Sequence, residues 1–138
     1  MSIKPPLRIS VAIIAFASLS VAAGCVATHD SVADMTYTDL AILGEVVTKF
    51  SWDECNNVGS MQHLYDIAKR KGLMEPGLAS DGWGNPYNLR IQKTDAEIVF
   101  LVTSGGPNGR YENGRGDHMS CEIRIAKSGE NSYQRFRN

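Results

Sequence analysis

The chain has 138 residues, of which 43% are hydrophobic, and its 14 basic and 15 acidic residues give a net charge of −1. This length provides one modest hydrophobic core and excludes a second domain of ordinary size. The near-zero charge argues against a surface for nucleic acid, which requires a marked excess of basic residues.

The N-terminal residues follow the layout of a secretory signal peptide. Lys4 and Arg8 precede an uncharged apolar stretch from Ile9 to Ala23, which ends in small residues just before Cys25. The stretch has about 15 residues, fewer than the roughly 20 of a membrane-spanning helix, so a permanent membrane helix is the weaker alternative. The small residues before Cys25 also resemble a bacterial lipobox. We therefore expect residues 1–24 to be a signal peptide and Cys25 to carry a lipid.

The expected location is the cell envelope. Val26, after the lipid-attached cysteine, resembles the sorting pattern of outer-membrane lipoproteins that face the periplasm or the cell surface. The alternative is a soluble periplasmic or secreted protein. Residues 25–35 show neither helical nor strand period, and we interpret them as a tether to a globular domain over residues 36–138.

Two helices are predicted at the start of that domain. From Thr36 to Phe50, apolar residues recur at three-and-four spacing, which is typical of an amphipathic helix. The next residues, which include Trp52 and Cys55, are expected to form a loop. Ser60 can then cap a second, short helix that ends at Gly72.

After the second helix the hydrophobic pattern takes a period of two, which predicts β-strands. Glycine and proline recur from Ser104 to Asp117, where we expect a long loop without regular structure. Two helices followed by an antiparallel sheet define an α+β fold. The expected elements are strands over 87–92, 97–103 and 121–125, turns over 93–96 and 128–131, and an edge strand over 133–136.

The three cysteines divide into one plus two if Cys25 carries lipid. Cys55 and Cys121 are then a lone pair in an oxidising compartment, where a disulfide is the usual outcome. Two buried, unpaired thiols are the alternative. A zinc site is less supported, because no close Cys/His spacing occurs in the sequence.

One segment resembles a known family. Asp81-Gly82-Trp83-Gly84-Asn85-Pro86-Tyr87 resembles the D-P-W-G-N-P-Y signature of the major pseudopilin of type II secretion systems, general secretion pathway protein G, at every position except the second. The resemblance covers roughly residues 37–125 and implies a pseudopilin-G-like fold, with a helix packed on a small antiparallel sheet. The glycines permit turns around Trp83, whose ring we expect to be buried, and Pro86 fixes the backbone that enters the strand. We therefore interpret the motif as architectural.

The family resemblance also implies a calcium ion in the late loop, at the positions of Leu101, Ser104, Asn108 and Asp117. Calcium prefers six to eight oxygen ligands, and its affinity follows the number of carboxylates. Asn108 stands where the family usually has an acidic residue, so binding should be weakened. The alternative is an ordinary connection in which the Asn-Gly pairs form turns.

The N-terminus departs from that family, because it lacks a prepilin cleavage site followed by an apolar assembly helix with a Glu near its start. We expect a non-enzymatic lipoprotein whose pseudopilin-like domain binds or scaffolds envelope or secretion-system proteins, without nucleic acid or a small-molecule substrate. The alternatives are a divergent pseudopilin that serves protein secretion and a small secreted hydrolase. The hydrolase would use Ser104, Asp117 and His118, which have the residue types of a catalytic triad but no G-x-S-x-G elbow.

Overall fold

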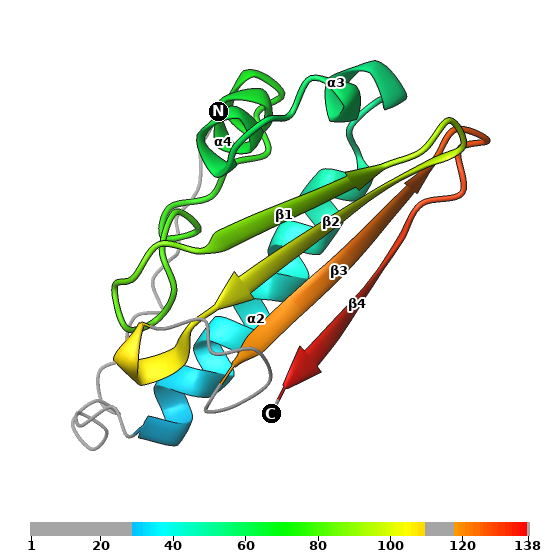
Figure 1. Cartoon of the computed structure of the whole chain (residues 1–138). Helices are drawn as coiled ribbons and strands as arrows, with labels where there is room; N and C mark the ends of the chain where they lie inside the picture. Colours follow the sequence, from blue (N-terminus) through cyan, green and yellow to red (C-terminus); the bar gives the residue numbers. More distant parts are fainter. Residues whose placement is uncertain (1–28, 110–117, 138) are drawn as a thin grey trace, which may run out of the picture. The chain divides into compact units, whose positions relative to one another are not determined.

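The computed structural model describes residues 29–109 and 118–137. The chain divides into two compact units after Ser31, and the fold considered below is that of the second unit, Val32–Asn138. A long helix, α2 (His29–Thr48), covers one face of a four-stranded antiparallel sheet, and the shorter helices α3 (Trp52–Asn56) and α4 (Met61–Arg70) follow it (Figure 1). Helices packed on an antiparallel sheet confirm the expected α+β class.

Helix α2 begins at His29, within residues 25–35, which we interpreted as a tether. The tether interpretation is wrong from His29 onwards, and residues 25–28 lie outside the described residues. The reason is tertiary packing, because Ala33 is 8% exposed and Thr36 is fully buried. The first turns therefore already face the domain. The buried face of the helix consists of Ala33, Thr36, Leu40, Leu43, Val47 and Phe50, and it extends just past the last turn.

Helix α3 occupies residues that we expected to form a loop. Ser51 caps its start, because the Ser51 hydroxyl accepts a hydrogen bond from the amide of Glu54 at 3.1 Å. In return, the Glu54 carboxylate accepts a hydrogen bond from the amide of Ser51 at 2.8 Å. The sequence contains the pattern of this capping box, Ser-x-x-Glu, which predicts the start of a helix here instead of a loop.

Helix α4 confirms the second predicted helix, including its ends. The hydroxyl of Ser60 accepts a hydrogen bond from the amide of His63 at 3.1 Å, which makes Ser60 the N-cap. Leu64 and Ala68 are fully buried on one face of the helix. Gly72 follows the last turn with a φ of 71°, a left-handed conformation that glycine adopts without strain.

The sheet has the strand order β1-β2-β3-β4, and each neighbouring pair is antiparallel. Both predicted turns and the C-terminal edge strand are confirmed. Strand β2 continues to Ser104 and is followed by a short 3-10 helix, η3 (Gly106–Asn108). The prediction of a loop without regular structure from Ser104 onwards is therefore wrong for Ser104 and for η3. Residues 110–117 of that loop lie outside the described residues. The strands are β1 (Asn88–Lys93), β2 (Glu97–Ser104), β3 (Met119–Ala126) and β4 (Ser132–Arg137).

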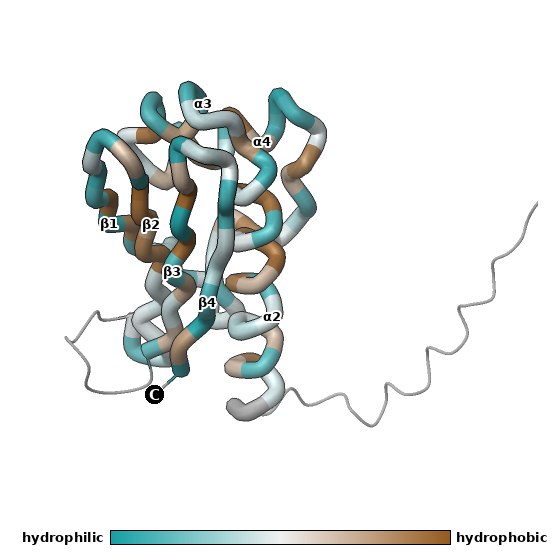
Figure 2. The backbone as a smooth tube through the Cα atoms, turned by 90° about the vertical axis from the view of Figure 1, so that its right-hand side faces the viewer, coloured by the Kyte–Doolittle hydropathy of each residue, from teal (hydrophilic) through white to brown (hydrophobic). Residues whose placement is uncertain are grey.

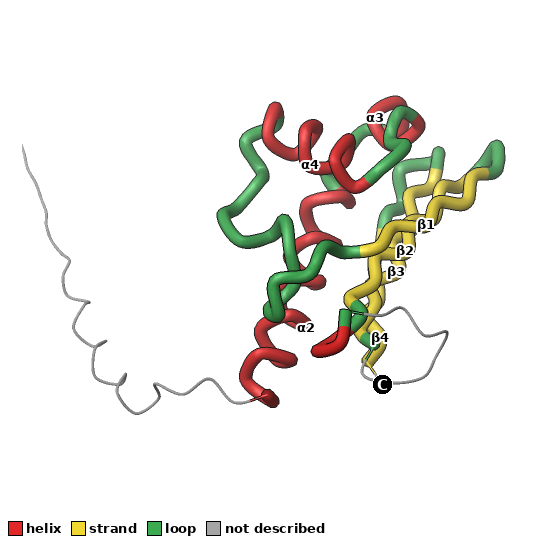
Figure 3. The backbone as a smooth tube through the Cα atoms, turned by 60° about the vertical axis from the view of Figure 1, so that its left-hand side comes forward, coloured by secondary structure: helices red, strands yellow, loops and turns green. Residues whose placement is uncertain are grey.

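One face of the sheet is buried against α2, as Figure 3 shows with the sheet seen close to its edge. Phe100 and Val102 of β2 are fully buried, whereas Leu101 between them points to the outer face. The hydrophobic stretches of β2 and α2 in Figure 2 belong to this core. The outer face carries apolar side chains such as Leu101 beside charged ones, and on it the guanidinium of Arg124 lies 3.1 Å from the carboxylate of Glu97.

Edge strand β4 packs on α2 through aromatic and polar contacts. A Cβ atom at Gly44 would lie 2.6 Å from the ring of Tyr133, so only glycine fits under this ring. The Tyr133 hydroxyl donates a hydrogen bond to the Glu45 carboxylate at 3.1 Å. The Arg135 guanidinium donates a hydrogen bond to the carbonyl of Tyr37 at 2.9 Å and lies 4.0 Å from the centroid of its ring. Gly44 is thus needed for close packing, although its helix propensity is low.

Candidate functional site

The segment that resembles the pseudopilin signature is organised around the carboxylate of Asp81, which is 4% exposed. One carboxylate oxygen accepts hydrogen bonds from the backbone amides of Trp83 at 3.0 Å and Asn85 at 2.8 Å. The other oxygen accepts a hydrogen bond from the hydroxyl of Ser104 at 2.7 Å. Three donors replace the water that a buried carboxylate loses, so this charge is stabilised within the fold.

The same segment also holds the first turns of α2. The amide of Gly82 donates a hydrogen bond to the hydroxyl of Thr36 at 2.8 Å. A Cβ atom at Gly82 would lie 2.7 Å from that hydroxyl and 2.8 Å from a methyl carbon of Val32. Gly82 therefore permits a close approach between segment and helix, and it also lies in the expected turn, which the hydrogen bond from the amide of Gly84 to the carbonyl of Asp81 closes at 3.0 Å. The expected turn glycine is Gly84, whose φ is 84°.

The aromatic residues of the segment pack against the core to different extents. Trp83 is only half-buried, so the expectation of a buried ring is met in part. Tyr87 is 5% exposed, and its hydroxyl forms no hydrogen bond with any residue in the described part of the chain. Burial raises the pKa of Tyr87, and the nearby carboxylates of Asp39 and Asp81 raise this pKa further. Tyr87 therefore remains a neutral core residue.

The described members of the implied calcium set lie in β2 and in the short helix η3. Leu101 pairs with residues on both neighbouring strands and precedes Ser104 by three residues of β2, which places the two about 10 Å apart. The Ser104 hydroxyl is already bonded to Asp81, and it accepts a hydrogen bond from Gly106 at 3.1 Å. Asn108 lies in η3, and Asp117 lies outside the described residues. A calcium ion in the late loop therefore stays a prediction, because Asp117 is the carboxylate of the implied set and carboxylates determine calcium affinity.

The residues of the alternative hydrolase are only partly brought together. His118 is 9% exposed and directly precedes β3, whose first residue pairs with Ser104. However, the Ser104 hydroxyl donates its proton to the carboxylate of Asp81. A catalytic serine instead donates to the imidazole that acts as its base. Asp117 lies outside the described residues.

The expected disulfide between Cys55 and Cys121 is absent, since both are free, buried cysteines. Helix α3 is held at the end of the sheet where β1 finishes, because the Lys93 ammonium donates to the carbonyl of Asn56 at 2.6 Å. Ile125 of β3 is in register with this end, and Cys121 lies four residues before it in β3. A disulfide requires Cβ atoms about 4 Å apart. Burial raises the pKa of each thiol to about 12.

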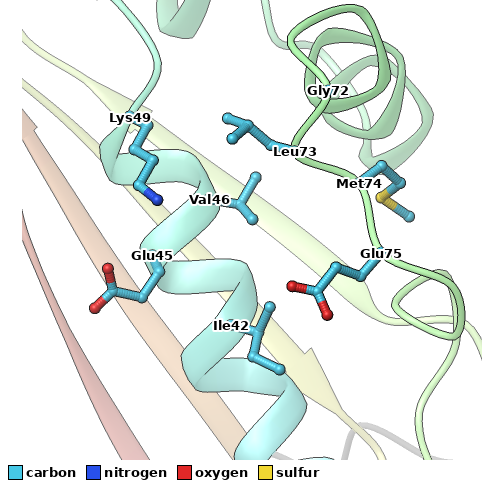
Figure 4. Close-up of a pocket in the computed structure, with 8 residues that line it drawn as sticks. All are labelled: Ile42, Glu45, Val46, Lys49, Gly72, Leu73, Met74 and Glu75. Carbon is cyan, nitrogen blue, oxygen red and sulfur yellow. The ribbon is translucent and has the colours of Figure 1, made fainter. Parts of the chain in front are cut away.

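A groove that the sequence did not predict lies between α2 and the residues that follow α4 (Figure 4). Apolar side chains form its floor, and charged side chains stand around it. We call it the α2 groove. Its lining residues are Ile42, Glu45, Val46, Lys49, Gly72, Leu73, Met74 and Glu75. The signal in the sequence is a second set of α2 residues at three-and-four spacing, distinct from the face that covers the sheet.

The expected signal peptide over residues 1–24 and the expected lipid site at Cys25 lie outside the described residues. Within residues 29–109 and 118–137, no helix has the length and apolar character needed to span a membrane. In the same residues, no three His, Cys, Asp or Glu side chains are grouped so as to hold a metal ion.

The described residues thus present a rigid motif around Asp81 and a separate groove along α2. Comparison with known protein families, with curated proteins and with solved structures finds no match to this chain.

Proposed function

We propose that this protein is a non-enzymatic lipoprotein of the cell envelope, in which a pseudopilin-G-like domain binds or scaffolds envelope or secretion-system proteins. The observation that carries the proposal is the Asp81 carboxylate, which accepts hydrogen bonds from Trp83, Asn85 and Ser104. These bonds, with that of Gly82 to α2, give the family-like segment a supporting role. A rigid scaffold of this kind suits a domain that acts by protein contacts.

The chemistry of Ser104 supports a role without catalysis. Its hydroxyl donates to Asp81 at 2.7 Å and accepts from the amide of Gly106 at 3.1 Å, so the side chain joins the motif to the end of β2. Both of these bonds are made within the fold, which favours a structural role for the side chain. Calcium in the late loop stays a prediction that the proposal does not require, because Asp117 of the implied set lies outside the described residues.

The envelope location rests on the sequence. Lys4, Arg8 and the apolar stretch up to Ala23 support export, and Cys25 after small residues supports lipid attachment. A single lipid group on Cys25 would hold the domain at a membrane surface, which we propose to be the outer membrane. A soluble periplasmic or secreted form is the alternative.

The intact mass of the protein purified from its native envelope tests this proposal. We expect a chain that begins at Cys25 and carries added lipid mass. The Cys25→Ala variant should lack the lipid mass and keep residues 1–24, because cleavage before this cysteine follows lipid attachment, whereas the matched control Thr28→Ala should be processed like the wild type. An unmodified chain in the soluble fraction would overturn the lipoprotein assignment.

A second candidate is a divergent pseudopilin, and the match between the segment 81–87 and the pseudopilin signature favours it. Prepilin peptidase cleaves after glycine and leaves an N-methylated residue. Gly24 is the only glycine before Cys25, so both kinds of processing would produce the same new N-terminus. The mass distinguishes them, because N-methylation adds one methyl group and lipidation adds a diacylglycerol.

A further inference from the structure

The α2 groove lies on a face of α2 separate from the face that covers the sheet. Asp39, Ile42, Val46 and Lys49 follow one another at spacings of three or four residues, so they align along the helix. The segment from Gly72 to Glu75 forms the opposite wall (Figure 4). The cavity between the walls measures about 360 Å³, which is within the range of binding pockets in proteins.

The groove is formed before any partner arrives. The amide of Leu73 donates a hydrogen bond to the carbonyl of Ala68 at 2.8 Å, and the amide of Gly72 donates to that of Lys69 at 3.0 Å. These bonds attach the wall to the last turn of α4. A preformed site loses little conformational entropy on binding, which favours affinity even where the contact area is small.

The floor of the groove is apolar and incompletely covered. Val46 is 6% exposed, and Ile42, Leu73 and Met74 are half-buried. All four belong to or pack against the main hydrophobic core. An apolar side chain placed on them would remove further apolar surface from water, at about 25 cal/mol per Å².

The charges at the ends of the groove have opposite sign. Glu75 lines one end, and Asp39 precedes Ile42 by one turn of α2 on the same side; partial burial and then the charge of Glu75 raise the pKa of Asp39. Lys49 stands at the other end. None of these three side chains forms an ion pair with another residue in the described ranges. Two like charges without a counter-ion provide a place for a cation.

We propose that the α2 groove binds an extended peptide segment of a partner protein, with a basic residue at the Asp39–Glu75 end, apolar residues in the middle and an acidic residue at Lys49. Lys49 directly follows α2 and lies ten positions after Asp39, about 15 Å at 1.5 Å per residue. About five extended residues span this length. The inference rests on the proposed binding role and specifies the chemistry of the partner.

Fluorescence anisotropy of labelled peptides tests the inference on the full-chain protein in detergent. The matching peptide is Lys-Leu-Ser-Leu-Glu, whose leucines share one side of an extended chain. One control, Glu-Leu-Ser-Leu-Glu, places a like charge at the acidic end, and a second control, Lys-Ser-Ser-Ser-Glu, lacks the apolar side chains. We expect the matching peptide to bind about fivefold to tenfold more tightly than either control.

A charge exchange locates the binding site. In the Lys49→Glu variant, the affinity for Lys-Leu-Ser-Leu-Glu should fall about fivefold to tenfold, and Lys-Leu-Ser-Leu-Lys should become the preferred peptide. Lys127→Glu, at an exposed turn outside the groove, is the matched control and should keep the original preference. Both lysines are exposed, so neither change disturbs the core.

Three results would overturn the inference. They are equal binding of matching and control peptides, equal behaviour of Lys49→Glu and Lys127→Glu, and no anisotropy change at millimolar protein. A dimer in sedimentation that Lys49→Glu alone dissociates would assign the groove to a second copy instead. The mass experiment tests the proposed envelope role separately. If Cys25 carries lipid, that role is supported even where the peptide-binding inference fails, so failure of the inference is distinguishable from failure of the proposed function.

Discussion

At Asp81, a carboxylate with 4% exposure accepts three hydrogen bonds. The two amide donors lie within four residues, and turn chemistry of Asp makes them predictable from the sequence. The third donor, Ser104, lies 23 residues away in the chain. Thr36, the partner of Gly82, lies 46 residues away. The sequence could therefore indicate that the segment is architectural, but not which elements it supports.

Replacing Asp81 by Asn should destabilise the domain. The amide group keeps one acceptor oxygen but presents a donor to Ser104, whose hydroxyl proton then has no acceptor at this position. Hydrogen bonds to charged groups contribute about 1.5–3 kcal/mol each, so we expect the free energy of unfolding to fall by about 2 kcal/mol. Urea unfolding followed by circular dichroism measures it.

Asp95→Asn is the matched control for this change, because Asp95 is exposed in the turn between β1 and β2. Its effect should remain within about 0.5 kcal/mol. If both variants unfold at the same urea concentration as the wild type, the Asp81 network does not stabilise the fold.

Among the helices and strands, those with local signals are predicted well. Ser60 and Gly72 define the ends of α4, and the period of two defines the strands. The start of α2 is missed because Ala33 and Thr36 are buried by residues that follow much later in the chain. The α2 groove is missed for a similar reason, since Leu73 has no helical or strand pattern that would place it against α2.

Gly44→Ala tests how α2 meets β4. Alanine is favoured over glycine in a helix by about 1 kcal/mol, but a Cβ atom here would lie 2.6 Å from the ring of Tyr133. Overpacking costs about 1–3 kcal/mol, so we expect a net loss of up to about 2 kcal/mol in the free energy of unfolding.

The sign of this effect should reverse in a Tyr133→Ala background. Without the ring, the added methyl group meets no clash, and its helix propensity should stabilise the double variant relative to Tyr133→Ala by up to about 1 kcal/mol. The same loss from Gly44→Ala in both backgrounds would mean that the ring does not determine the choice of glycine.

For the whole molecule, the proposed export and the observed core lead to different expectations for the cysteines. An oxidising compartment favours a disulfide, whereas the fold places Cys55 in α3 and Cys121 in the middle of β3, both buried and free. Residue spacing in the sequence gives no measure of this separation. Burial in the core, and not pairing, is then what protects the thiols from oxidation.

A thiol reagent distinguishes the two states in a Cys25→Ala chain. Native protein at pH 8 should not react, and the unfolded protein should expose both Cys55 and Cys121 as free thiols. The absence of any thiol after unfolding would show that the disulfide forms and that the separation of α3 from Cys121 is wrong.

The pH dependence of stability follows from the same burial. Both thiols have a pKa of about 12 in the fold, against 9.0 for an unburied thiol, so from about pH 9 upwards the unfolded chain releases protons that the folded chain retains. Their contribution to stability is therefore complete below about pH 9 and is lost progressively towards pH 12. Urea unfolding at pH 8 and pH 10 should show a larger loss for the wild type than for a Cys55→Ala, Cys121→Val variant. If the wild type and the variant lose the same stability, the thiols do not release protons on unfolding between those pH values. A disulfide between them would give the same result, because it leaves no thiol to titrate.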